Sequence, residues 1–299
     1  MLIVPSVTCE IGVIGGTGLY KASGLTNITE HTIDTPFGPT SSKIVIGQLH
    51  GQNVAFIARH DVGHRLTPTE VPFRANIWAL KLLGVKYLIS FGAVGSLTLQ
   101  LQPTHFVIVD QFIDRTKNRD STFFGNGVVG HVSFGDPVCG KLSKLLKEAV
   151  DKVPKEGVQC HMGGTYVCME GPAFSTRAES KMYQQIGGTV IGMTCLQEAK
   201  LAREAEIAFG CVAMVTDYDC WYEAHGNVTV EEVYKVLTGN AEYAQLVLSE
   251  AVKALSNNKF VSEAHSALSV GLMTPLNNIS KENQDRLGPI INRFFEKKQ

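Results

Sequence analysis

The feature that most constrains this chain is an apolar run that ends in two carboxylates. Residues 207–214 carry no charged side chain, and Asp217 and Asp219 follow shortly after them. A short apolar run without alternation is typical of a strand buried on both faces, as in parallel sheets. In open α/β sheets, ligands bind outside the carboxyl ends of such strands. The acidic turn therefore predicts a ligand site at the edge of an α/β sheet.

The two aspartates are spaced so that they can act on one ligand. Residues two apart point to the same side if the backbone stays extended. Two neighbouring carboxylates repel each other, which raises the pKa of one of them and keeps it protonated. Such a pair suits a ring with two nitrogens to satisfy, as in adenine. The ionised group could accept from the 6-amino group of adenine. The protonated group could donate to ring nitrogen seven as a general acid. The alternative interpretation is a pair that caps the next helix or solvates a loop.

Composition excludes several classes of function. The chain has 299 residues, of which 44% are hydrophobic and 18% charged, as in ordinary globular proteins. A net charge of -1 gives no electrostatic basis for binding nucleic acid or an acidic membrane. No apolar run approaches the roughly 20 residues of a membrane span. Residues 1–5 have no signal-peptide character, so we expect a cytoplasmic protein, with a nuclear location also compatible. The seven cysteines lack metal-ligand spacing, which predicts buried free thiols, such as Cys168 and Cys211, and no metal.

Two further segments are candidates for binding an anion. Residues 11–14 form an apolar strand that runs into a glycine-rich turn, where backbone N–H groups and the Thr17 hydroxyl can face a phosphate. The turn is not a dinucleotide fingerprint, because Lys21 occupies the place of the third glycine, and it is not a P-loop. A predicted hairpin, residues 43–58, delivers Arg59 and His60 to a polar loop that also holds His64. Arginine suits bidentate binding of phosphate, although polar loops often hold such residues without a function.

Strands and helices alternate along the chain, which predicts a single α/β domain over residues 1–299. We expect strands at residues 86–91, 106–110, 165–169 and 190–194, and helices at residues 70–83, 141–153, 175–186, 195–205 and 228–252. Ser175 is an expected N-cap. Residues 92–96 are expected to form a second small-residue turn, residues 115–130 a surface loop, and residues 280–299 a helical tail. Glu170 and Phe174 could bind sugar hydroxyls and stack on a base, or could serve as a cap and a core residue.

Several separated motifs occur together and in order. They are Ile14-Gly15-Gly16-Thr17-Gly18, Asp34-Thr35-Pro36-Phe37-Gly38, Ala58-Arg59-His60, Ala75-Asn76-Ile77-Trp78-Ala79-Leu80, Glu170-Gly171-Pro172 with Phe174, Arg177-Ala178-Glu179, Gly192-Met193-Thr194, and Thr216-Asp217-Tyr218-Asp219-Cys220-Trp221. In this combination, over residues 10–240, the chain resembles the 5'-methylthioadenosine phosphorylases of the purine nucleoside phosphorylase superfamily.

The resemblance implies a fold, a reaction and an assembly. The fold would be a mixed, mostly parallel central β-sheet flanked by helices, and the protein would be a homotrimer. The reaction would be phosphate-dependent cleavage of 5'-methylthioadenosine to adenine and 5-methylthioribose 1-phosphate, in purine and methionine salvage. Inorganic phosphate is then a co-substrate, and neither an organic cofactor nor a metal is required.

The resemblance also implies roles for individual residues. Asp217 would protonate the purine at nitrogen seven, and Asp219 would accept from the 6-amino group. The expected phosphate-binding residues are Thr17, Arg59, His60, Ala93 and Thr194. The expected substrate-binding residues are Phe174 beside the base, Met193 on the sugar, His64, Val230 and Tyr234 around the 5' substituent, and His131, which would reach across from a neighbouring subunit.

Three positions depart from the family pattern. Gly92 stands where the family usually has Thr, Ala173 replaces an Arg, and Tyr234 stands where an apolar Leu commonly meets the methylthio group. A tyrosine hydroxyl at that place favours a 5'-hydroxyl on the substrate, and an apolar pocket rejects an added hydroxyl by only about 10². The first alternative function is therefore an adenosine-preferring 6-aminopurine nucleoside phosphorylase.

Three other functions remain as alternatives. A nucleoside hydrolase would use water, for which Arg59 and His60 are unnecessary. A 6-oxopurine phosphorylase would set Asp219 against a carbonyl acceptor, which is unfavourable. A non-catalytic nucleoside-binding protein would bind its ligand tightly without turnover, with Gly92 as a sign of lost activity.

Overall fold

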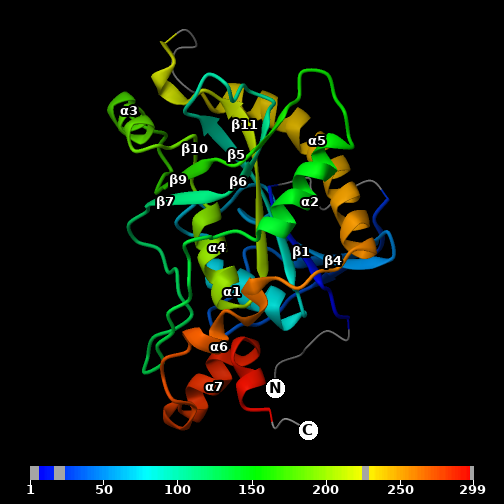
Figure 1. Cartoon of the computed structure of the whole chain (residues 1–299), viewed down its shortest axis with the longest axis vertical. Coiled ribbons are helices and arrows are strands. Elements are labelled where there is room, and N and C mark those ends of the chain that lie inside the picture. Colours follow the sequence, from blue (N-terminus) through cyan, green and yellow to red (C-terminus); the bar gives the residue numbers. More distant parts are fainter. Residues whose placement is uncertain (1–6, 17–23, 224–228, 297–299) are drawn as a thin grey trace.

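One large sheet organises the molecule (Figure 1). The computed structural model describes residues 7–16, 24–223 and 229–296, and the eleven strands of this part of the chain join in a single sheet. The strands are β1 (Ile11–Gly15), β2 (Thr26–His31), β3 (Ile44–Leu49), β4 (Gln52–Ala58), β5 (Tyr87–Ser96), β6 (Phe106–Val109), β7 (Gln111–Arg115), β8 (Cys160–Met162), β9 (Thr165–Met169), β10 (Val190–Gly192) and β11 (Ala208–Asp217). The α-helices are α1 (Phe73–Leu82), α2 (Gly140–Asp151), α3 (Arg177–Gln185), α4 (Cys195–Glu204), α5 (Val230–Asn257), α6 (Leu268–Gly271) and α7 (Lys281–Leu287).

The strand β5 lies at the centre of the sheet. It pairs in parallel with β1 and β11, and its last residues pair antiparallel with β10. The sheet continues from β1 through β4, β3 and β2, from β10 through β9 and β7, and from β11 through β6 and β8. Six of the ten ladders are parallel, which confirms the mixed, mostly parallel sheet.

The turn predicted at residues 92–96 is wrong, because these residues belong to β5. Glycine and alanine have weak strand propensity, which favoured a turn in the sequence. In the fold, however, β11 pairs with residues 87–95 on one side, and β10 pairs with Gly95 and Ser96 on the other. The ladder hydrogen bonds on both sides hold this segment extended in spite of its composition.

Helices cover both faces of the sheet. Along β11, Ala208, Val212 and Met214 pack into a core with side chains of α2 and α5. The alternate residues Phe209 and Cys211 pack into a second core with side chains of α1, α4 and the C-terminal segment. The period of two along a strand therefore sorts the apolar residues of β11 between two cores. Cys168 and Cys211 are buried and all seven cysteines are free, as predicted.

One local prediction on a helix boundary is wrong, and one on a loop is incomplete. The N-cap of α3 is Thr176 instead of Ser175, because the Thr176 hydroxyl and the Glu179 carboxylate form a reciprocal capping box. The segment after β7 has no helix or strand over residues 116–130 and is mostly exposed, as predicted, but it also contains the fully buried Phe123 and the buried side chain of Arg119. Polar and glycine residues dominate the composition of this segment, so no local pattern indicated that Phe123 and Arg119 are buried.

The C-terminal tail is helical in short pieces. It consists of α7 and the 3-10 turns η6 (Gly288–Ile290) and η7 (Asn292–Phe294), and residues 297–299 lie outside the described part. Ile290 and Ile291 are fully buried, and Phe294 and Phe295 pack against the same core, so the tail is anchored by an apolar face. Figure 1 shows α6 and α7 at one end of the molecule and α3 at the other. Across residues 7–16, 24–223 and 229–296, the helices are too short or too polar to cross a membrane.

Candidate active site

The ladder register brings residues from four strands to one level of the sheet. Ala58 pairs with Gly15 and Ile14 pairs with Ser90, so the residues after β4 lie level with residue 92 of β5. Ile191 pairs antiparallel with Gly95, and the chain then enters α4 beside Gly92, where an added Cβ would be 3.3 Å from Cys195 Sγ. The site is therefore a strip along the second half of β5, between Arg59, Thr194 and the end of β11.

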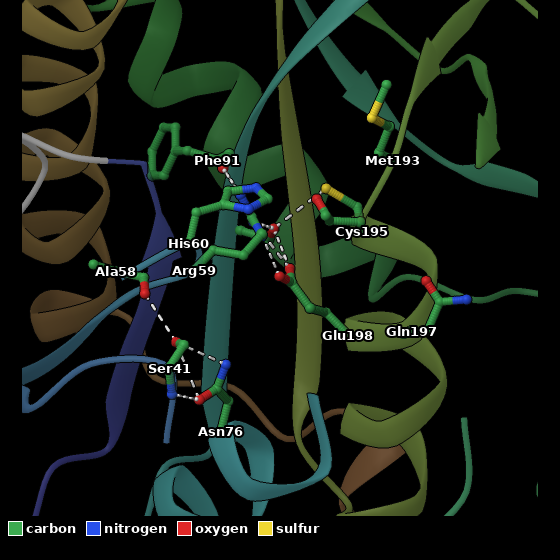
Figure 2. A network of polar contacts seen from close by, with 12 residues as sticks. Ser41, Ala58, Arg59, His60, Asn76, Phe91, Met193, Cys195, Gln197 and Glu198 are labelled. Carbon is green, nitrogen blue, oxygen red and sulfur yellow. Dashed lines mark hydrogen bonds and ion pairs between the residues drawn. The ribbon is translucent and has the colours of Figure 1, made fainter. Parts of the chain in front are cut away.

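Arg59 lies at the floor of this strip, and four of its five N–H donors are engaged within the protein. Its side chain is buried, and Nε and Nη2 donate to the two carboxylate oxygens of Glu198 at 2.5 and 3.1 Å. Nη2 also donates to Ser90 Oγ at 2.8 Å, and Nη1 donates to the Phe91 carbonyl at 3.0 Å (Figure 2). Burial disfavours the charged guanidinium, but the Glu198 carboxylate more than offsets it and raises the pKa of Arg59. A guanidinium has five N–H donors, so one Nη1–H is left to face an anion.

His60 is the second cationic candidate, and the fold keeps it neutral. Burial and the neighbouring Arg59 charge lower the pKa of His60 to about 4. Its Nδ1 lies 2.9 Å from the Leu66 carbonyl, so Nδ1 carries the proton and Nε2 is an acceptor. His64 stacks on His60 with ring centroids 4.4 Å apart, and its side chain is exposed. His64 therefore lies beside the predicted phosphate residues, at the open side of the site.

The N-terminus of α4 faces the same strip. Thr194 is buried and is the residue before α4, and its hydroxyl makes no capping hydrogen bond to the helix. The N–H groups of the first helical turn then have no helical partner, which suits an anion. Ala93, the next residue of β5 after Gly92, is half-buried beside this helix start. Figure 2 shows Met193 at the start of α4, with its side chain directed away from the Arg59–Glu198 pair. Thr17 lies outside the described residues.

The two aspartates lie at the other end of the strip. Asp217 ends β11, and the backbone turns at Asp219, whose φ is 51°, so the chain does not stay extended through both residues. Aspartate tolerates this left-handed conformation better than most residues. Both side chains nevertheless lie against Gly95, where an added Cβ would be 3.0 Å from Asp217 Oδ1 and 3.3 Å from Asp219 Cβ.

The hydrogen bonds of the two carboxylates differ. Asp217 Oδ1 accepts from the Asp219 backbone N–H at 2.7 Å, and Asp217 Oδ2 accepts from the Thr216 hydroxyl at 2.7 Å. Asp219 Oδ2 is buried, and among the described residues no donor reaches it. A buried acceptor without a partner costs about 1–3 kcal/mol. The site therefore offers Asp219 as a vacant acceptor for the donor of a ligand.

The remaining candidates are exposed side chains on two segments, one next to the acidic turn and one on the helix α5, which contacts β11. Cys220 Sγ donates to the Ser175 carbonyl at 3.1 Å, which brings Phe174 next to the turn with 44% of its surface exposed. Val230 and Tyr234 lie in the first turns of α5 and are 72% and 68% exposed. Further along α5, Asn240 donates to the Val215 carbonyl of β11 at 3.1 Å. Six residues of helix separate Tyr234 from that contact, about 9 Å along the axis, so this end of α5 extends past the end of β11.

His131 does not lie in the site of its own chain. Its backbone N–H donates to the Gly271 carbonyl at 2.7 Å, and it lines a cavity of about 250 Å³ together with Lys200 and Glu204. Glu204 is the last residue of the ten-residue helix α4, and Thr194 precedes the first. The two ends of α4 are about 15 Å apart, so His131 and the strip along β5 lie at opposite ends of this helix.

The sequence-based reasoning missed Glu198 and Arg119. Glu198 was detectable, because it is a charged residue within the apolar face of α4 and is nearly fully buried with Leu196 and Ala199. A charge that is buried in a helix requires a partner. Arg119 had no comparable signal, since its partners, which include Glu170 and Gln197, are distant in the sequence.

Comparison with known proteins places this geometry in a family. A sequence profile described as the phosphorylase superfamily matches residues 10–253. The chain is 53% identical to the S-methyl-5'-thioadenosine phosphorylase of Synechocystis sp., over 97% of this chain and 89% of that protein. It is 45% identical to the enzyme of the same name from Emericella nidulans, over 99% of this chain and 87% of that protein.

Solved structures agree with the sequence relatives. A methylthioadenosine phosphorylase from an antarctic soil metagenomic library has 49% identity and a TM-score of 0.92, covering 95% of this chain and 99% of that chain. A variant of the adenosine/methylthioadenosine phosphorylase from Schistosoma mansoni, in complex with methylthioadenosine, has 31% identity and a TM-score of 0.80, covering 88% of this chain and 96% of that chain. The chain therefore belongs to the phosphorylase superfamily and, within it, to the family of the S-methyl-5'-thioadenosine phosphorylases.

Proposed function

We propose that this protein is a 5'-methylthioadenosine phosphorylase, which cleaves the N-glycosidic bond with inorganic phosphate. The products are adenine and 5-methylthioribose 1-phosphate, so the enzyme acts in purine and methionine salvage. This proposal rests on one observation: the strip along β5 has one end suited to an anion and one acidic end. One end of the strip holds Arg59 and the start of α4, which suit an anion, and the other holds a carboxylate pair with a vacant acceptor. The near-complete match to enzymes of this name supports the substrate.

The proposed reaction exchanges one bond for another at the sugar carbon. A phosphate oxygen forms a bond to the sugar carbon while the bond between this carbon and the purine nitrogen breaks. The electron pair of the broken bond goes to the purine, and a proton from Asp217 to nitrogen seven neutralises it. General acid catalysis of this kind contributes roughly 10²–10⁴-fold. The remaining rate enhancement comes from holding the phosphate, the sugar and the acid in line. The reaction therefore requires neither an organic cofactor nor a metal.

The phosphate would be held by complementary donors and acceptors. The last Nη1–H of Arg59 and the N–H groups of the first turn of α4 donate to phosphate oxygens. The neutral His60 cannot donate through Nε2, so it accepts from a protonated phosphate oxygen. Thr17, Thr194 and the backbone of Ala93 complete the proposed phosphate site.

The purine and the sugar would lie between the phosphate and the acidic turn. Asp219 Oδ2 accepts from the 6-amino group, which fills its vacant acceptor position. Phe174 borders the base and Met193 packs on the sugar. His64, Val230 and Tyr234 surround the 5' substituent, and the Tyr234 hydroxyl makes adenosine a second substrate in our proposal.

We also propose that the protein is a homotrimer in the cytoplasm, where its free thiols stay reduced. The support for assembly is the position of His131, which faces away from the site of its own chain. An exposed apolar set surrounds it, since Val129, Val270 and Met273 are 47%, 88% and 60% exposed. Met273 N–H donates to the Val129 carbonyl at 2.9 Å, so these residues form one surface. A neighbouring subunit would cover this surface and receive His131 in its site.

The proposed function is tested by measuring purine release from methylthioadenosine, adenosine and inosine, each with and without phosphate. Phosphate-dependent cleavage in which methylthioadenosine gives the highest kcat/KM is the expected result. A higher kcat/KM for adenosine would favour the adenosine-preferring enzyme. Release that is independent of phosphate would indicate a hydrolase, and preferential cleavage of inosine would remove the role assigned to Asp219. Binding without any turnover would indicate a non-catalytic nucleoside-binding protein.

A further inference from the structure

Arg119 is a buried arginine that belongs neither to the proposed phosphate-binding residues nor to the proposed substrate-binding residues. Only 1% of its side chain is exposed. Nη1 donates to the Met193 carbonyl and to Gln197 Oε1, the latter at 3.1 Å. Nη2 donates to the carbonyls of Glu170 and Met169, and Nε donates to Glu170 Oε1 at 3.2 Å. One guanidinium therefore binds three carbonyls, one carboxylate and one amide.

These partners are the ends of two neighbouring strands. Met169 ends β9 and Glu170 follows it, while Met193 follows β10, and the two strands are paired in parallel. The last carbonyls of adjacent strands lack further ladder partners and require other donors. Arg119 supplies these donors to both strand ends at once, from a segment far away in the sequence.

The contacts of Glu170 and Gln197 fix the guanidinium in turn. Glu170 Oε2 accepts from the Lys117 backbone N–H at 2.6 Å, and Oε1 also accepts from the Thr69 hydroxyl. Gln197, in the first turn of α4, donates to the Thr116 hydroxyl at 2.9 Å. The segment that carries Arg119 is thus held on both sides, and Arg119 has a defined position.

Both strand ends lead directly into proposed substrate contacts. The residues after Glu170 lead to Phe174, and Met193 is followed by Thr194. The two segments also touch, because a Cβ on Gly171 would lie 2.5 Å from Met193 Sδ. Gly171 has a φ of 71°, so glycine suits both its backbone and the close approach of Met193. A displacement of either strand end would therefore move the sugar contact and the base contact relative to each other.

We propose that Arg119 is a positioning residue that sets the relative position of Met193 and the segment of residues 170–174. It does so through their backbone carbonyls and touches no reacting atom. This inference deepens the function proposed above and rests on it. Lysine is a poor replacement, because one ammonium has three donors on a flexible stem and cannot reproduce a planar fork. Loss of the guanidinium leaves carbonyls of both strand ends unpaired.

The test compares Arg119→Lys and Arg119→Ala with a control at the other end of the same segment. Arg286 donates to the carbonyls of Phe123 and Gly125, and Arg286→Met releases that end of the segment. For both Arg119 variants we expect KM for methylthioadenosine to rise about tenfold or more, a size typical for loss of one well-placed polar contact. We expect a smaller change in kcat, and an unchanged KM in Arg286→Met. Millimolar guanidinium chloride should lower KM of Arg119→Ala and leave Arg119→Lys unaffected.

Two outcomes would overturn the proposal. One is a lower melting temperature in the Arg119 variants with an unchanged KM at temperatures where they are folded. The other is an equal rise of KM in Arg286→Met, which would show that any loosening of the segment suffices. If Arg119→Ala does not fold, Arg119→Lys carries the same comparison. If the wild-type protein releases no purine, the proposed function has failed, and adenine binding by calorimetry then tests Arg119 separately. An unchanged affinity of Arg119→Lys for adenine would contradict the positioning role.

Discussion

At the scale of single residues, Arg59 combines a buried charge with a proposed role in anion binding. Its charge is already balanced by Glu198, and both side chains are nearly fully buried. Breaking a buried pair by removing one partner costs about 3–5 kcal/mol, because the other charge is left uncompensated. The Glu198 carboxylate therefore holds Arg59 in place and at the same time competes with phosphate for it.

Glu198→Gln should separate these two effects. We expect a clearly lower melting temperature without phosphate, because Arg59 loses its counter-charge. Added phosphate should raise the melting temperature of the variant more than that of the wild type, since the anion then replaces the missing charge. Scanning fluorimetry over a phosphate series measures both effects. Glu10→Gln is the matched control, because Glu10 pairs with Lys86 and Lys259 at the surface. Equal phosphate-dependent shifts in Glu198→Gln and wild type would contradict this account of Arg59.

His60 links the site to the pH dependence of stability. Its pKa is about 4 in the fold, where burial and then the Arg59 charge disfavour protonation, against an ordinary value of 6.5. Between these values the unfolded chain binds a proton that the folded chain does not, so the free energy of unfolding falls as the pH falls from 6.5 to 4. His60→Gln should show a shallower fall over this window. Denaturant titrations of the wild type and of His60→Gln across the window in phosphate-free buffer measure it. A slope of His60→Gln equal to wild type would refute the assignment.

At the scale of elements, the close packing of β5, β10 and β11 positions the acidic turn. A Cβ on Gly95 would lie 3.0 Å from Asp217 Oδ1 and 3.2 Å from Ile191 Cγ2. Gly95→Ala should therefore displace the carboxylates, and displacements near 1 Å cost about 10²-fold in rate. We expect a large loss of kcat with a small change in melting temperature. Gly239→Ala in α5, where a methyl group meets nothing within 4 Å, is the control. Wild-type kcat in Gly95→Ala would show that the turn is not held against β5.

The elements that could be predicted from the sequence are those that depend on local patterns. The apolar run before Asp217 and the hairpin before Arg59 follow from local patterns, and both agree with the structure. The strand at residues 92–96 and the burial of Arg119 do not, because each depends on partners from distant segments. Local propensity favoured a turn at residues 92–96, and tertiary pairing overrode it. Arg119 does lie in a loop, but its burial results from partners at the ends of β9 and β10 and on α4. The candidate site residues were found from motifs. The charge of Glu198 within the apolar face of α4 was a local signal for a buried partner, whereas its pairing with Arg59 and the contacts of Arg119 depend on distant segments and become visible only in the fold.

At the scale of the whole molecule, the position of His131 predicts that a complete site requires two chains. Asp217 and His131 of one chain lie at different ends of the protein, so a trimer would pair the Asp217 of one subunit with the His131 of the next.

Asp217→Asn and His131→Ala should each have a low kcat/KM for methylthioadenosine as pure proteins. When the two variants are co-expressed, a site is intact if its own subunit keeps Asp217 and the neighbouring subunit keeps His131. Random mixing in a cyclic trimer makes about a quarter of the sites intact, so about a quarter of the wild-type activity should return. Mixing the two assembled proteins, with the assay completed before subunits exchange, should restore none. Activity of the co-expressed sample equal to the mean of the separate variants would show that each site is built from one chain.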